Sequence, residues 1–168
     1  MMETKTKLYA LNFQEVKTYL LVVVFVLCNM VLPQLFHLVP QGGIIFAPLS
    51  LVILAGSYKF GWKVGLLAAI CSPLANHVAF GLPAWGVLQV MALKLVVLAL
   101  AAGLTAQYFR RLSLLLLVGV VLVSELLGGL GEWLLTGGIA ATVADFTIGW
   151  PGLLLQVLGT YALIKYLK

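Results

Sequence analysis

Long apolar stretches are the feature that most constrains how this chain can fold. The hydrocarbon core of a membrane, about 30 Å thick, needs roughly 20 apolar residues for each helix that crosses it. Cutting the chain at its polar, glycine and proline residues leaves six stretches of about this length, at residues 16–38, 43–60, 62–80, 85–109, 112–135 and 148–167. We therefore expect an all-α integral membrane protein in which residues 1–168 form a single domain of six transmembrane helices.

The composition excludes several other classes of protein. Hydrophobic residues make up 63% of the chain and charged residues only 9%, whereas soluble domains average about 25% charged residues. The formal charge of +5 does not indicate nucleic-acid binding, because the basic residues are dispersed between apolar stretches. We expect the outer surface to face lipid and no soluble catalytic domain to be present.

The placement of basic residues gives an independent test of the six spans. With six spans, nine of the ten basic residues fall on one side of the membrane: Lys5, Lys7, Lys17, Lys59, Lys63, Arg110, Arg111, Lys165 and Lys168. Cytoplasmic segments carry such an excess of Lys and Arg. We therefore expect both termini to be cytoplasmic.

Lys94 is the tenth basic residue and lies within the fourth apolar stretch. Its position nine residues from the outer end of that stretch corresponds to a depth of about 14 Å. A charged residue at this depth needs a partner or a water-filled cavity. Glu125, on the antiparallel fifth stretch, lies at nearly the same depth, so we expect the two to pair.

A polar pocket is expected around this pair. Glu132 lies seven residues after Glu125, on the same helical face and closer to the outside, and Gln89 lies just over one turn above Lys94. We expect these residues to line a pocket that opens outward. The alternative is an ion pair that only holds two helices together.

Asn76 and His77 end the third stretch near the outer face, and Trp85 begins the fourth. A polar pair beside an aromatic ring suits a ligand with a flat apolar body and hydrogen-bonding edges. We add these three residues to the predicted binding site. Trp85 fits equally well in the belt of aromatic residues that many membrane proteins place at the interface.

Glycines and prolines interrupt the second and third stretches. Gly61 and Gly65 form a G-x-x-x-G pair, which predicts a face on which a neighbouring backbone packs closely. Pro48 and Pro73 lie within spans, and each removes a backbone hydrogen bond. We expect both prolines to kink their helices around a pocket.

No pattern in the sequence predicts a metal site or a catalytic nucleophile. Cys71 and His77 are six residues apart, which on a regular helix separates them by about 240°. We interpret Cys71 as a buried structural cysteine. The common hydrolase, zinc-protease and phosphate-loop motifs do not occur, so we expect no enzyme activity, no cofactor and no bound metal.

The run FAPLSLVILAGSYKFGWKVGLLAAICSPLANHVAFGLP, with its G-x-K-x-G and its helix ending in G-L-P, resembles the substrate-binding S components of energy-coupling-factor (ECF) transporters. Such a resemblance implies a six-helix protein in the plasma (inner) membrane of a prokaryote that binds a water-soluble vitamin or related micronutrient near the outer face. It also implies a transmembrane coupling subunit and two ATPase subunits as partners.

The first helix lacks the alanine-spaced pattern that many S components present to the coupling subunit. We therefore take Gly61 and Gly65 as the candidate partner interface. The resemblance leaves the ligand open, and a biotin-like acid facing Lys94 or a cobalamin bound through Cys71 both fit it. Two other classes also remain: a membrane scaffold or assembly factor, and an integral membrane enzyme that acts on a lipid-like substrate.

Overall fold

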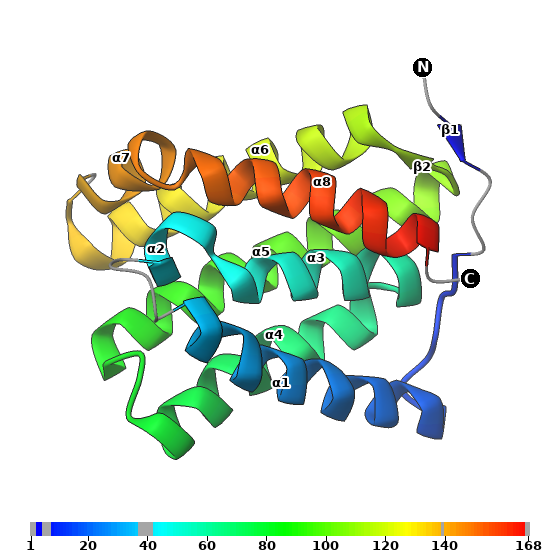
Figure 1. Ribbon diagram of the computed structural model, residues 1–168, viewed down its shortest axis with the longest axis horizontal. Coiled ribbons are helices and arrows are strands. Elements are labelled where there is room, and N and C mark those ends of the chain that lie inside the picture. Colours follow the sequence, from blue (N-terminus) through cyan, green and yellow to red (C-terminus); the bar gives the residue numbers. More distant parts are fainter. Residues whose placement is uncertain (1–2, 5–7, 37–41, 139, 167–168) are drawn as a thin grey trace.

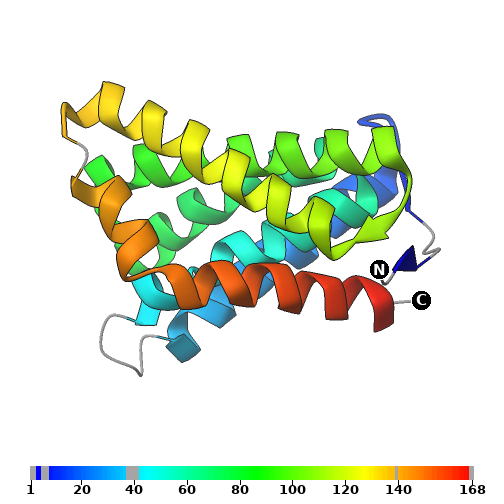
Figure 2. The same cartoon turned by 90° about the horizontal axis from the view of Figure 1, so that it is seen from above.

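The computed structural model describes residues 3–4, 8–36, 42–138 and 140–166. Apart from one short strand pair, these residues form a bundle of helices that run along a common axis (Figures 1 and 2). The helices are α1 (Val16–Phe36), α2 (Gly42–Phe46), α3 (Pro48–Phe60), α4 (Trp62–Phe80), α5 (Trp85–Phe109), α6 (Leu114–Thr136), α7 (Ala140–Thr147) and α8 (Trp150–Tyr166). Strands β1 (Glu3–Thr4) and β2 (Leu112–Ser113) pair antiparallel.

Four helices in the described part of the chain, α1, α4, α5 and α6, are long and apolar enough to cross a membrane. They match the first, third, fourth and fifth predicted stretches, and they indicate a membrane-embedded helical bundle. Helix α8, with 17 residues, falls within the sixth predicted stretch. The structure therefore confirms the all-helical, membrane-type fold class.

The second predicted stretch is not one continuous helix. It is divided into α2 and the 13-residue α3 at Ala47, whose φ of 41° lies in the left-handed region. Pro48 follows as the first residue of α3, a position where the missing N–H of proline costs no helical hydrogen bond. Pro48 therefore starts a helix, and the expectation that it kinks the interior of one is wrong. Pro73 does lie inside α4.

Close helix approaches in the bundle depend on glycine. A Cβ atom on Gly65 would overlap the side chain of Ser57 across the α3–α4 contact, and one on Gly61 would lie 3.3 Å from Cα of Ala10. The G-x-x-x-G pair therefore provides close packing, but both glycines are buried against other parts of the same chain. This corrects their assignment to a partner interface, because a buried glycine presents no surface to a second protein.

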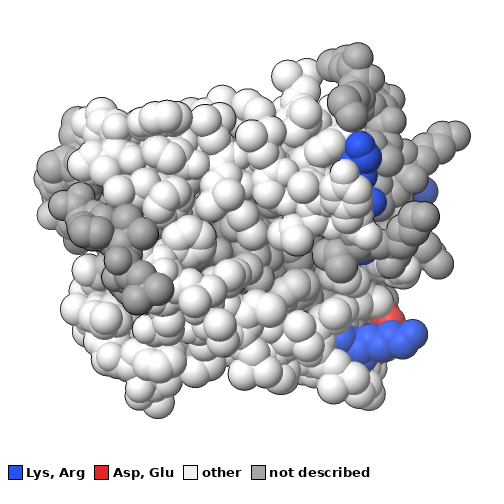
Figure 3. Space-filling view, in the orientation of Figure 1, with Lys and Arg blue, Asp and Glu red and all other residues white. Residues whose placement is uncertain are grey.

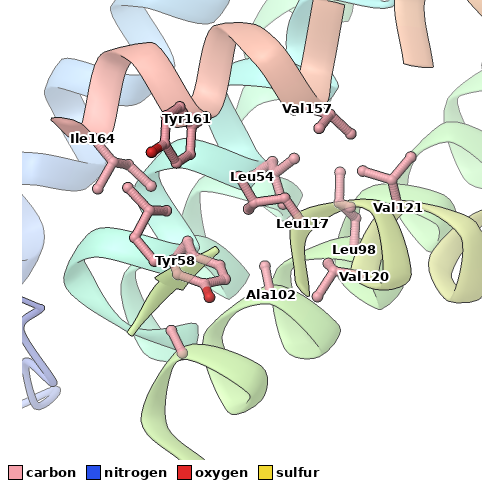
Figure 4. Packing of buried hydrophobic residues seen from close by; sticks show 12 residues of the cluster. Leu54, Tyr58, Leu98, Ala102, Leu117, Val120, Val121, Val157, Tyr161 and Ile164 are labelled. Atoms are coloured by element: carbon pink, nitrogen blue, oxygen red, sulfur yellow. The ribbon is translucent and has the colours of Figure 1, made fainter. Parts of the chain in front are cut away.

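One half of the bundle is filled by an apolar core. Buried side chains from α3, α5, α6 and α8 pack together there (Figure 4), among them Leu54, Tyr58, Leu98, Leu117 and Ile164. The Tyr58 hydroxyl donates a 2.8 Å hydrogen bond to the backbone carbonyl of Arg111. This bond ties α3 to the turn between α5 and α6.

Basic residues gather at the same end of the bundle as this core. In the face that Figure 3 shows, the blue side chains of Lys and Arg lie at the end of the molecule where the two chain termini and β2 are found in Figure 1. Helices α2 and α7 lie at the opposite end (Figures 1 and 2). We call these the basic end and the distal end.

Candidate ligand-binding cavity

A cavity of about 970 Å³ lies in the distal half of the bundle. Its wall includes residues of α1, α3, α5, α6 and α8 and the loop between α4 and α5. Along α5 it reaches from Gly86, in the first turn, to Leu98. Twelve residues of helix correspond to a depth of about 18 Å. Leu98 also belongs to the apolar core, which therefore closes the cavity at its inner end.

A salt bridge joins two helices at the cavity wall. The Nζ atom of Lys94, on α5, lies 2.6 Å from Oε2 of Glu132, on α6. The same carboxylate oxygen accepts a 3.1 Å hydrogen bond from the Thr142 hydroxyl of α7. The side chains are 22% and 8% exposed, respectively. A charged pair thus lies in a largely apolar wall with its lysine partly open to the cavity.

The partner of Lys94 in this ion pair is Glu132, whereas the sequence argument favoured Glu125. Helical side chains lean toward the N-terminus of their own helix. Helix α5 begins at the distal end and α6 ends there, so Lys94 leans toward the distal end and Glu132 leans back to meet it. Glu125 lies about 10 Å deeper than Glu132 on the same helix. The direction of lean therefore accounts for the contact between Lys94 and Glu132, and the pairing of Lys94 with Glu125 stays a prediction.

The close approach of α5 and α6 at this point depends on Gly128. A Cβ atom there would lie 2.9 Å from Cγ and 3.5 Å from Cα of Lys94. The aliphatic part of the lysine therefore crosses the surface of α6 where a larger residue would push it away. One turn further, a Cβ atom on Gly131 would lie 2.6 Å from Leu93. These glycines let the lysine side chain run between the two helices.

Asn76, which the sequence assigned to the site, lines the cavity and is 5% exposed. Its Nδ2 atom donates 2.9 Å hydrogen bonds to the backbone carbonyls of Asn29 and Ser72. Asn29 in turn donates a 3.0 Å hydrogen bond from Nδ2 to the Ser72 hydroxyl. This buried network fixes α1 against α4 and leaves the Oδ1 acceptor of Asn76 available to a ligand.

Gln156 is a residue of the cavity wall that the sequence analysis missed. It lies on α8, is 1% exposed, and its Oε1 atom has no hydrogen-bond partner among the described residues. An unpaired buried carbonyl is uncommon and costs stability. Its signal in the sequence is a single glutamine within the apolar run LLLQVL.

Three predicted site residues are not among the described residues that line the cavity: His77, Trp85 and Gln89. The His77 Nδ1 atom lies 2.8 Å from the carbonyl oxygen of Pro83, and its ring centroid lies 5.7 Å from that of Trp85. His77 therefore holds the loop between α4 and α5 in place. Trp85 is 61% exposed and Gln89 is also exposed. Glu125, by contrast, lines the cavity as expected.

Neither cysteine is placed to bind a ligand in the cavity. Cys28 and Cys71 are free and exposed, and neither is among the described lining residues. The expectation that Cys71 is buried is wrong: it occupies a face of α4 that points out of the bundle. In the described part of the chain, no group of three His, Cys, Asp or Glu side chains is arranged to hold a metal ion.

Comparisons with known proteins identify no relative. The chain matches no protein-family model, and neither the curated proteins nor the solved structures contain a significant match. The function must therefore be argued from the cavity and the bundle themselves.

Proposed function

We propose that this protein binds a small water-soluble nutrient, a vitamin or related micronutrient, and serves as the membrane-embedded S component of an ECF-type transporter. The single observation that carries the proposal is the cavity in the distal half of the bundle. Its volume of about 970 Å³ falls within the range of small-molecule sites, about 300–1,000 Å³.

The chemistry of the wall supports a binding role. Its lining is mostly aliphatic, with a small number of polar groups that include Lys94, Glu132, Asn76 and Gln156. Ligand sites in proteins have this composition, in which apolar walls supply affinity and a few polar groups supply specificity. A scaffold protein has no use for a cavity of this size, since an unfilled cavity lowers stability.

The proposed topology has six spans, formed by α1, by α2 with α3, and by α4, α5, α6 and α8. Basic residues lie at one end of the bundle and, under the positive-inside rule, mark the cytoplasmic side. The cavity then opens outward from the plasma (inner) membrane of a prokaryote, with both termini inside. This orientation suits capture of a nutrient from the surroundings.

The proposed partners are a transmembrane coupling subunit and two ATPase subunits. The proposal needs them because the sequence contains no phosphate-binding loop of the G-x-x-x-x-G-K-[ST] type. Uptake against a gradient requires an energy source, and in this proposal ATP hydrolysis by the partners supplies it.

Native mass spectrometry of the gently solubilised protein tests the binding proposal, because a tightly held nutrient stays with the protein. We expect a bound mass of vitamin size, and we expect the same compound to raise the melting temperature after it is added back to ligand-free protein. A scaffold would give no bound mass and no compound that raises the melting temperature. An enzyme would convert the bound compound during incubation.

A further inference from the structure

A second cavity, of about 710 Å³, lies at the basic end of the bundle (Figure 1). The segment before α1 forms one of its walls, because the backbone N–H groups of Tyr9 and Leu11 donate hydrogen bonds of 2.7 and 3.2 Å to carbonyl oxygens at the end of α3. The first turn of α4 and the last turn of α5 form the other walls. This basic-end cavity shares no described lining residue with the larger cavity in the distal half.

Two cationic side chains line the basic-end cavity, Lys63 on α4 and Arg110 at the end of α5, and none of its described lining residues is acidic. An acid close by is Glu15, whose carboxylate accepts a 2.9 Å hydrogen bond from the backbone N–H of Asn12. Counting Glu15 against the two cations still leaves a net charge of +1. The cavity therefore suits a ligand with at least one negative charge.

The contacts that hold Lys63 do not neutralise it. Its Nζ atom donates a hydrogen bond to Oδ1 of Asn12 and lies 5.3 and 5.7 Å from the ring centroids of Phe13 and Trp62. An amide oxygen and two aromatic rings orient an ammonium group without cancelling its charge. Asn12 is itself fixed, because its backbone carbonyl accepts a 2.6 Å hydrogen bond from the Thr18 hydroxyl. An anion in this cavity thus meets a cation that is already held in place.

The polar groups of the wall are mainly donors. Arg110 has five N–H groups in a planar fork that matches the oxygens of a phosphate, and Lys63 is a compact cation of the kind that also binds phosphate. Asn12 uses its side-chain oxygen for Lys63, so its Nδ2 hydrogens are the side-chain group left for a ligand. Helix α4 begins and α5 ends beside the cavity, so their partial charges of opposite sign largely cancel. The side chains therefore favour an anion rich in acceptors, such as a phosphate group.

The position of the basic-end cavity indicates a lipid as the source of this phosphate. Helix α4 has 19 residues and is apolar enough to cross a membrane. Its length of about 28 Å is close to the thickness of the hydrocarbon core, about 30 Å, so its first turn lies at the level of the lipid headgroups. Tyr108 and Phe109, in the last turn of α5, are exposed, and aromatic residues are enriched at this level of a membrane. They provide an apolar surface beside the cavity for acyl chains.

We propose that the basic-end cavity binds the phosphate headgroup of an anionic phospholipid. Lys63 and Arg110 contact the phosphate oxygens, and the acyl chains lie against the exposed apolar surface of the bundle. Basic pockets between transmembrane helices on the cytoplasmic side of a membrane bind headgroups of this kind. In the proposed topology the lipid belongs to the cytoplasmic leaflet. The site goes beyond the proposed nutrient-binding function and does not depend on it.

Native mass spectrometry of the full chain, stripped of lipid by detergent exchange, tests this site. The probes are dioleoylphosphatidylglycerol and dioleoylphosphatidylcholine, which have the same acyl chains and differ in the net charge of the headgroup. We expect the anionic lipid to bind more tightly. Glycerol 1-phosphate, which has the phosphate but no acyl chains, is expected to bind much more weakly than the anionic lipid.

Substitution of the two cations tests their role. Lys63→Gln and Arg110→Gln are each expected to weaken binding of phosphatidylglycerol about fivefold, the contribution of one Lys or Arg beside an anionic lipid, and to leave binding of phosphatidylcholine unchanged. Arg110→Gln is the second variant in case Lys63→Gln, which also alters the contact with Asn12, fails to fold. Lys17→Gln is the matched control. It removes the same charge at the same end of the bundle, but Lys17 is exposed and does not line the cavity, so we expect no change.

Three outcomes would overturn the lipid site. The first is equal affinity for the two lipids, and the second is a loss in Lys17→Gln as large as the losses in Lys63→Gln and Arg110→Gln. The third is glycerol 1-phosphate binding as tightly as the anionic lipid, which would indicate a soluble phosphate compound as the ligand. None of these results bears on nutrient binding, because neither Lys63 nor Arg110 lines the larger cavity.

Discussion

Removing Lys94 is predicted to destabilise the protein through Glu132, and a double-mutant cycle measures this effect. In Lys94→Met the Glu132 carboxylate, whose side chain is 8% exposed, loses the cation at 2.6 Å and keeps the Thr142 hydrogen bond. Loss of one partner of a fully buried ion pair costs about 3–5 kcal/mol. Because 22% of the lysine side chain is exposed, water already solvates part of this pair, and we expect about 2 kcal/mol.

The assay is thermal unfolding of detergent-solubilised variants. For a chain of this length, about 2 kcal/mol corresponds to a fall in melting temperature of roughly 4–8 °C. Glu132→Gln is expected to cost less, since the flexible lysine can turn toward the cavity. The double variant, with no ionised group left at either position, is expected to be more stable than the sum of the two single losses indicates. If the losses add to within about 0.5 kcal/mol, the two side chains are not coupled and the ion pair does not stabilise the bundle.

Three other predictions address packing and topology. Gly65→Ala is expected to lower stability by about 1–3 kcal/mol in thermal unfolding, because the methyl group of the new alanine overlaps a serine of α3. The control is Gly119→Ala, whose Cβ meets nothing within 4 Å and which is expected to cause no loss of stability. Equal losses in the two variants would contradict the close α3–α4 contact. Tyr58→Phe is expected to cost about 1 kcal/mol in the same assay, since it removes one buried hydrogen bond; an unchanged melting temperature would show that this bond contributes nothing. In a cysteine-free background, Gly138→Cys is expected to react with a membrane-impermeant maleimide in intact cells and Arg110→Cys only after permeabilisation; the reverse pattern would invert the proposed topology.

Much of the helical architecture could be predicted from the sequence because the bilayer imposes a strong length requirement. Helices α4 and α5 have the predicted bounds, and α6 differs from the prediction by a few residues. The sequence did not predict the break between α2 and α3. The backbone at Ala47 is left-handed, and an alanine gives no indication of that conformation, which glycine or asparagine adopts more readily. The short helix α7 was also missed, since it is too short to appear as a membrane span.

The candidate site was less predictable than the helices. Composition was enough to identify Lys94 as a residue that needs a partner, because a lysine within an apolar stretch is rare. The contact of Lys94 with Glu132 depends on the direction in which each side chain leans, which spacing along the helix alone does not give. The role of Gln156 follows from contacts between distant segments, and no local pattern encodes them.

Under the proposed transport function, the apolar core beneath the cavity limits the route that a bound molecule can take. A ligand that rests in the cavity has tightly packed side chains such as Leu54 and Leu117 between it and the basic end. Simple diffusion along the bundle axis is therefore blocked, and the resting conformation is not that of a channel. In the proposed transport cycle, release on the far side requires either that the helices separate around the core or that the whole bundle changes its orientation in the membrane.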